Sequence, residues 1–154
     1  MELQSPFDVL KFLKEIVEEQ VPLNKHLGIR LESLNAEGVC LKIGMTDLLI
    51  GNYIQGILHG GVISSFLDVT GTVTAWTAVL NTMPNPAKEE IAAAISRIGT
   101  IDLRVDYLRP GRGTYFKSTG SIMRAGKRVA VIRMELYNDA QALVAAGTGT
   151  YTVG

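Results

Sequence analysis

The chain has 154 residues, of which 47% are hydrophobic, 15 are basic and 15 are acidic. This length suits a single domain over residues 1–154, and the charge balance argues against a nucleic-acid partner or an anionic membrane. The high hydrophobic fraction favours an oligomer, because a small monomer normally buries less. Cys40 is the only cysteine, which excludes an intramolecular disulfide, and we interpret it as a small hydrophobic residue in a strand.

The N-terminal segment, residues 1–21, has the pattern of an amphipathic helix. Ser5 is the expected N-cap and Pro6 the first helical residue. Apolar side chains then recur at helical spacing, at Val9, Leu10, Leu13, Ile16 and Val17. Pro22 should end this helix and begin a loop that extends to Gly28. The early acidic residues differ from the basic start of a signal peptide, so we expect a cytoplasmic protein without a membrane segment.

Two segments that alternate apolar and polar residues, 29–32 and 39–43, follow this loop. A short glycine-containing turn separates them, which predicts an antiparallel pair of strands. His26 precedes the pair in the expected loop. We interpret His26 as structural, because no residue near it in the sequence could orient it for catalysis.

The most informative segment covers residues 52–80. It passes through His59-Gly60-Gly61 and continues through apolar and small residues, which predicts a helix over residues 60–80, about 30 Å long. Because this helix is apolar around most of its circumference, it should be buried. Asp68 is its only charged residue, and a buried carboxylate is costly unless it is paired, hydrated or functional.

The rest of the chain predicts mainly strands. Residues 83–98 form an insert with weak helical character, which we interpret as surface decoration, with a lid as the alternative. Four segments with strand periodicity follow, at residues 101–107, 114–123, 129–137 and 143–153. The order of elements predicts an α+β fold in which an antiparallel sheet curls around the long central helix.

The start of the central helix has the features of an oxyanion site. The free amides of Gly60 and Gly61 would favour negative charge, and the missing side chains would let a substrate oxygen approach. Asn52 could supply another amide donor. Asp68 would be the base, but it lies about 12 Å from Gly60 along the helix axis, too far for one carbonyl to contact both. Antiparallel pairing of this helix between two subunits would bring the two groups together, which predicts sites shared across a dimer.

Each of these features also has a structural interpretation. His59-Gly60-Gly61 taken alone is a common turn, and Asp68 could be a buried acid paired with Thr72 or Arg104. A glycine-fronted helix, an upstream amide and a lone acid in an apolar helix are more specific together than separately.

Asn52, the HGG motif and an aspartate eight residues after its first glycine resemble the PaaI-like hotdog-fold thioesterases, and most of all the YigI-like proteins of enteric bacteria. The segment GTIDLRVDYLRPG, residues 99–111, also resembles the family's strand after the central helix. The resemblance implies a hotdog fold, with dimers joined edge to edge and often paired into tetramers. It also implies hydrolysis of acyl-coenzyme A (acyl-CoA) thioesters without a metal or another cofactor.

Carried over by position, the resemblance implies a role for five residues. Asp68 would be the general base or nucleophile, and the Gly60 amide, aided by Asn52, would polarise the thioester carbonyl. His59 would contact the substrate or hold the loop. Thr100 would orient water at the start of the next strand, although strand threonines usually only pack.

Positive side chains for the phosphates of CoA are expected at the turn of residues 124–128, where Arg124, Lys127 and Arg128 suit charge-assisted hydrogen bonds. A role in solubility is the alternative for this turn. Arg109 and Arg112 are alternative phosphate contacts. The long insert departs from the family pattern, which leaves the acyl group open between a medium chain and an aryl ring.

Two further functions suit the same architecture. An enoyl-CoA hydratase or dehydratase of the hotdog fold commonly uses a paired Asp and His, whereas His59 precedes Asp68 in this chain. A non-catalytic acyl-CoA sensor is disfavoured, because the chain has no appended DNA-binding segment and no net basic charge.

Overall fold

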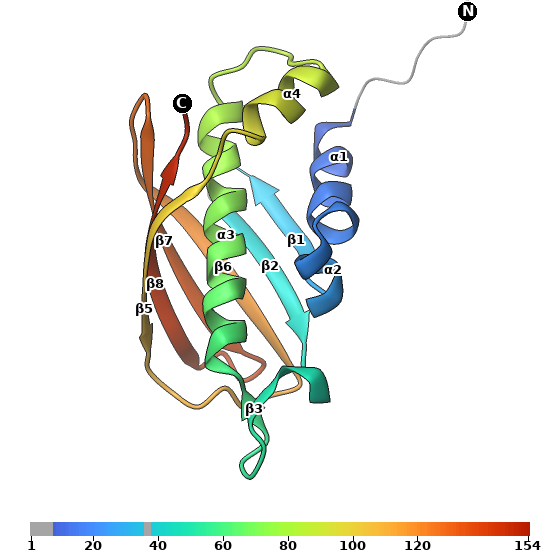
Figure 1. Cartoon of the computed structure of the whole chain (residues 1–154), viewed down its shortest axis with the longest axis vertical. Coiled ribbons are helices and arrows are strands. Elements are labelled where there is room, and N and C mark those ends of the chain that lie inside the picture. The colour runs from blue at the N-terminus through green and yellow to red at the C-terminus, as the bar shows by residue number, and fades with distance from the viewer. Residues whose placement is uncertain (1–7, 36–37) are drawn as a thin grey trace, which may run out of the picture.

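The computed structural model describes residues 8–35 and 38–154. Within these residues, six strands form one antiparallel sheet in the order β1-β2-β6-β7-β8-β5, and helix α3 (Gly60–Leu80) crosses one face of it (Figure 1). The strands are β1 (Arg30–Asn35), β2 (Gly38–Gly44), β5 (Thr100–Tyr107), β6 (Tyr115–Ala125), β7 (Val129–Asn138) and β8 (Leu143–Thr152). This arrangement confirms the predicted α+β fold and the predicted central helix.

The core lies between α3 and the sheet. Strand β7 shows the two-residue period, since its even-numbered side chains from Ala130 to Leu136 are buried and its odd-numbered ones face outward. Helix α3 contributes Ile63, Phe66 and Leu67 from its own buried face. Within the described residues, α3 is the one helix apolar and long enough to span a bilayer, and its packing on the sheet identifies it as the core helix.

Two glycines leave room for a tyrosine ring between α3 and the sheet. A side chain on Gly71 of α3, or on Gly149 of β8, would have its Cβ within 2.0 Å or 2.5 Å of the Tyr151 side chain. Tyr151 has no exposed surface, so its ring fills the space that the two glycines leave. Glycine is therefore required at both positions for the aromatic ring to lie between helix and sheet.

The N-terminal helices differ from the predicted single helix. Helix α1 (Val9–Glu15) begins after Asp8, whose carboxylate accepts a hydrogen bond from the Lys11 N–H at 3.1 Å. The predicted start at Ser5 and Pro6 lies outside the described residues. A π-helical turn (Ile16–Gln20) continues the chain into α2 (Pro22–Leu27).

The predicted loop after Pro22 was wrong, because α2 occupies those residues. Pro22 is the first residue of α2, a position where proline is favoured because its missing N–H would have no helical partner. Gly28 ends the helix in the left-handed conformation, with φ of 74°. His26 is consequently an exposed helical residue rather than a loop residue.

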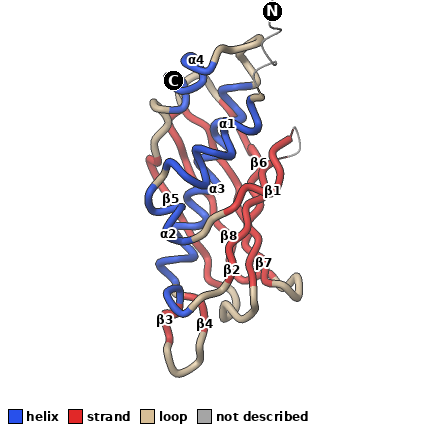
Figure 2. The backbone as a smooth tube through the Cα atoms, turned by 90° about the vertical axis from the view of Figure 1, so that its right-hand side faces the viewer, coloured by secondary structure: helices blue, strands red, loops and turns tan. Residues whose placement is uncertain are grey.

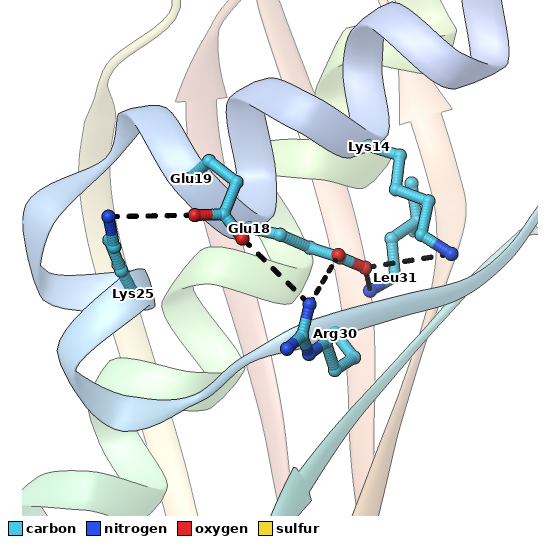
Figure 3. A network of polar contacts seen from close by, with 6 residues as sticks. All are labelled: Lys14, Glu18, Glu19, Lys25, Arg30 and Leu31. Carbon is cyan, nitrogen blue, oxygen red and sulfur yellow. Dashed lines mark hydrogen bonds and ion pairs between the residues drawn. The ribbon is translucent and has the colours of Figure 1, made fainter.

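Glu18, in the π-helical turn, connects the N-terminal helices to the edge strand β1 (Figure 3). Its carboxylate is only 8% exposed, and it accepts hydrogen bonds from Arg30 Nη1 at 2.9 Å and from the Leu31 N–H at 3.0 Å. Lys14 Nζ lies 3.8 Å from the same carboxylate. Glu18 therefore uses a backbone donor of β1 that would otherwise lack a partner at the sheet edge.

Two local features complete the fold. Strands β3 (Ile50–Asn52) and β4 (Ile57–Leu58) form a small hairpin, which follows a 3₁₀ turn (Asp47–Leu49) and projects at the end of the molecule where α3 begins (Figure 2). Sequence periodicity missed this hairpin, because its strands are only three and two residues long.

In the insert, helix α4 (Lys88–Ile95) buries Ile91 and Ala94 and contacts α3. The insert therefore packs on α3 through these two residues, while most of its other side chains are exposed.

Substitution Glu18→Ala should lower the free energy of unfolding by about 1–3 kcal/mol, because the Leu31 N–H and the Arg30 guanidinium lose a shielded partner. Glu19→Ala is the matched control: Glu19 is 49% exposed and its ion pairs with Lys25 and Arg30 are 3.6 and 3.9 Å long, so about 0.5 kcal/mol or less is expected. Urea unfolding of both variants measures the difference. Equal losses would contradict the role given to Glu18.

Substitution Gly71→Ala should destabilise the protein by about 1–3 kcal/mol despite the better helix propensity of alanine, because the new methyl group overlaps the buried Tyr151 ring. Gly44→Ala is the control, since a Cβ there would meet no atom within 4 Å. Thermal unfolding followed by circular dichroism compares the two variants. A Gly71→Ala protein as stable as wild type would show that helix and sheet can separate at this point.

Candidate active site

The first turn of α3 leaves one backbone donor free. His59 is the N-cap: its Nδ1 accepts a hydrogen bond from the Gly61 N–H at 2.7 Å, and its carbonyl oxygen accepts from the Val62 and Ile63 N–H groups, both at 3.0 Å. The Gly60 N–H has no hydrogen-bond partner among the described residues. The cap therefore leaves Gly60 as the amide available to a ligand at the positive end of the helix dipole.

His59 takes a structural position in this turn. Because Nδ1 accepts a hydrogen bond, the neutral imidazole carries its proton on Nε2. Gly61, expected to bind substrate, has its amide engaged by this cap. Tyr107, at the end of β5, donates its hydroxyl to the Gly60 carbonyl oxygen at 3.2 Å and links the helix start to the sheet. Tyr107 was not identified from the sequence, because it looks like an ordinary strand aromatic.

Asn52 lies at the end of β3, close to the same turn. Its Oδ1 accepts a hydrogen bond from the Gln55 N–H at 3.2 Å, while its side-chain N–H groups have no partner among the described residues. A hollow next to the helix start is lined by Gly51, Asn52, Tyr53, Ile57, Leu58, His59 and Gly60. The structure thus brings Asn52, His59 and Gly60 together, as the sequence predicted.

Asp68 is half-buried on α3 and contacts two hydroxyl groups. Its Oδ1 accepts hydrogen bonds from Thr100 Oγ1 at 2.8 Å and from the Tyr151 hydroxyl at 3.1 Å. The alternative pairing with Arg104 does not form, because Arg104 Nη2 instead lies 3.2 Å from Asp106. The carboxylate is therefore held by neutral hydroxyl donors from β5 and β8.

Tyr151 is the second residue that sequence reasoning missed. Burial, together with the nearby Asp68 carboxylate, raises the pKa of Tyr151 well above its ordinary value. The hydroxyl therefore stays protonated and remains a donor. Nothing in the alternating pattern of residues 143–153 distinguishes this tyrosine from a packing residue, and its contact with Asp68 spans 83 positions of sequence.

The cationic residues expected to bind phosphates lie at both ends of α3. Arg124, Lys127 and Arg128 are exposed at the β6–β7 hairpin, next to the C-terminal end of α3 and therefore far from Gly60 in the same chain (Figure 1). Arg112 lies near the start of α3 and donates to the backbone oxygen and Oε1 of Gln55 at 3.1 and 2.8 Å. Arg109 donates to the Leu143 carbonyl at 2.8 Å.

Cys40 lies half-buried on β2, and burial, with a smaller contribution from Glu32, raises the pKa of its thiol. A raised thiol pKa disfavours the nucleophilic thiolate, so Cys40 is a packing residue. Across residues 8–35 and 38–154, His, Cys, Asp and Glu side chains form no group of three that could hold a metal ion.

Comparisons with known proteins identify the family of the chain. Residues 55–145 match the family model described as the thioesterase superfamily. The chain is 44% identical over 145 residues to the medium/long-chain acyl-CoA thioesterase YigI of Escherichia coli, a match that covers 94% of each protein. It is 43% identical to the Salmonella typhimurium protein of the same name, again over 94% of each.

A crystal structure from Shewanella oneidensis, described as related to the thioesterase superfamily, superposes with a TM-score of 0.89 at 46% identity, covering 95% of both chains. The matched family region contains the whole of α3, with Gly60 and Asp68, and strands β5, β6 and β7. The chain belongs to the thioesterase superfamily, and its sheet wrapped around a long helix is the hotdog fold of that superfamily.

Proposed function

We propose that the protein hydrolyses acyl-CoA thioesters to a free acid and CoA, and that residues 1–154 act as one hotdog domain in the cytoplasm. The observation that carries the proposal is that α3 holds two groups suited to this reaction. One is the free Gly60 N–H at the start of the helix, and the other is Asp68, whose carboxylate accepts hydrogen bonds from hydroxyl groups. The YigI relatives, named medium/long-chain acyl-CoA thioesterases, support the same substrate class.

The proposed mechanism uses the Gly60 amide for electrostatic stabilisation. The thioester carbonyl oxygen accepts a hydrogen bond from the Gly60 N–H, and the helix dipole stabilises the negative charge that develops as the carbonyl carbon becomes tetrahedral. The side-chain amide of Asn52 is close enough to the same hollow to add a second donor. His59 contributes by holding the turn through its bond to Gly61.

Asp68 supplies the second half of the chemistry. As a general base it takes a proton from water, whose oxygen attacks the carbonyl carbon; the C–S bond then breaks and the CoA sulfur leaves with a proton. As a nucleophile, Asp68 would attack the carbonyl carbon itself, the C–S bond would break and release CoA as a thiolate that takes up a proton, and water would hydrolyse the resulting anhydride to the free acid and the Asp68 carboxylate. Both routes need an ionised carboxylate with one oxygen free.

We propose that each site is shared by two subunits, because eight helical residues separate Gly60 from Asp68 by about 12 Å. The sheet supports this geometry: the Leu31 N–H of edge strand β1 already bonds to Glu18, whereas the other edge strand, β5, exposes Ile101 and Tyr107. Pairing of two β5 edges about a two-fold axis runs the α3 helices antiparallel. Two such dimers would make a tetramer.

The same arrangement accounts for the distant cationic residues. In an antiparallel dimer, Arg124, Lys127 and Arg128 of one chain come to the end where the other chain's Gly60 lies, so they would bind the phosphates of its CoA. Arg112 is the proposed contact from the same chain. An enoyl-CoA hydratase is the alternative function: within one chain His59 bonds to Gly61 and Asp68 to two hydroxyls, so a His–Asp pair could form only across subunits.

Substitution Asp68→Asn should lower kcat for hydrolysis of decanoyl-CoA by about 100-fold or more, because the amide can neither accept a proton nor attack. The amide oxygen still accepts from Thr100 and Tyr151, so the fold should persist. Asp47→Asn, at an exposed acid outside the site, is the matched control. A folded Asp68→Asn protein with wild-type activity would contradict the proposal.

Substitution Gly60→Pro removes the proposed oxyanion donor without breaking the helix. Gly60 is the first helical residue, and His59 has φ of −63° and ψ of 133°, a conformation compatible with a following proline. We expect kcat to fall about 100-fold or more. Gly60→Ala keeps the N–H, and its Cβ would lie 3.5 Å from the Tyr107 ring, so this variant should retain far more activity. Equal activities of the two variants would rule out the Gly60 N–H as the oxyanion donor.

Mixing the two inactive variants tests the shared site. In a mixed dimer, one site combines both defects and the other combines an intact Asp68 with an intact Gly60. With random exchange of subunits, half of the dimers are mixed, so activity should return to about a quarter of the wild-type value. Activity that stays at background after verified subunit exchange would place both groups of one site in the same chain.

A further inference from the structure

We propose that Tyr151 is a positioning residue for Asp68: its hydroxyl holds one carboxylate oxygen so that the other faces the substrate. This inference rests on the proposed function, since it assigns Asp68 to the chemistry. It adds a residue from the last strand, β8, to a site otherwise built from α3, the loop before it and Thr100 at the start of β5.

The hydrogen bonds at Asp68 are asymmetric. Thr100 Oγ1, at 2.8 Å, and the Tyr151 hydroxyl, at 3.1 Å, both donate to Oδ1. Within the described part of the chain, Oδ2 has no hydrogen-bond partner. The Tyr151 hydroxyl also lies 3.3 Å from the Asp68 carbonyl oxygen, so it holds the side chain and the helix backbone at the same point. Oδ2 is therefore the oxygen left for water or for the thioester carbon.

The packing of Tyr151 makes it suited to this role. Its side chain is completely buried, and its ring occupies the space left by Gly71 and Gly149, where a methyl group on either would overlap it. A ring confined in this way cannot swing away when substrate enters, so its hydroxyl stays at a fixed position. Thr100, in contrast, is exposed at the start of edge strand β5.

Tyr151 is the buried one of the two hydroxyl donors to Asp68, and both donors are uncharged. The high pKa of Tyr151 keeps its hydroxyl protonated, so the hydroxyl remains a hydrogen-bond donor to the Asp68 carboxylate. On the neighbouring strand β5, Arg104 pairs with Asp106, and Asp102 is exposed. Neither hydrogen bond that Asp68 Oδ1 accepts comes from a charged group.

The test is Tyr151→Phe, assayed with decanoyl-CoA over a range of pH. Loss of the donor should lower kcat by about tenfold or more with little change in KM, because Tyr151 acts on Asp68 and not on substrate. The acidic limb of the kcat/KM profile should move to higher pH by about one unit, because the ionised carboxylate loses a donor. A purely structural role would lower stability without moving that limb.

Tyr137→Phe is the matched control. Tyr137 also donates its hydroxyl to a carboxylate, Glu135, but both lie on the outward side of β7, away from α3. This variant should keep the wild-type pH profile. If Tyr151→Phe does not fold, 3-fluorotyrosine at position 151 retains the ring and makes the hydroxyl a stronger donor. That replacement should move the acidic limb to lower pH.

The outcomes separate the two proposals. An active Asp68→Asn protein overturns the proposed function. An inactive Asp68→Asn protein combined with a wild-type pH profile for Tyr151→Phe overturns only the positioning role of Tyr151, and an unchanged profile for the fluorinated protein does the same. A shifted profile in Tyr151→Phe with no shift in Tyr137→Phe supports the role.

Discussion

The contact between α3 and the sheet determines both the stability of this protein and the geometry of its candidate site. Gly71 and Gly149 leave room for the Tyr151 ring, and that ring places its hydroxyl against Asp68. A bulkier residue at either glycine would push the helix outward and move the carboxylate with it. Packing and candidate chemistry therefore depend on the same small residues, so selection for one constrains the other.

The second constraint is the rigidity of a single helix. Gly60 and Asp68 belong to one element, so their separation is fixed by helical rise and cannot be adjusted by a loop. A site that needs both groups must obtain one of them from another molecule. In the proposed dimer, the exposed edge strand β5 and the cationic hairpin at the far end of α3 are not unrelated surface features, because both would be used in the same pair of chains.

The sequence predicted those elements whose signal repeats over many residues. The apolar run over residues 60–80 and the alternating segments of the sheet were long enough for their period to be recognised. The HGG turn and the lone acid were visible because their composition is unusual for a buried helix. Local exceptions were missed: a second helix starts at Pro22 where a loop was expected, and the β3–β4 strands are too short to show a period. Tyr107 and Tyr151 act through contacts distant in sequence, which no local pattern reveals.

Glu18 has a consequence beyond the stability of the N-terminal helices. A sheet with two open edges can add copies at both sides and grow into a ribbon. Here the carboxylate of Glu18 occupies the Leu31 N–H on one edge, while the opposite edge remains open. In the proposed dimer, edge-to-edge addition through β5 would therefore stop after two chains. A single buried acid in a π-helical turn would thereby separate finite assembly from fibrous growth.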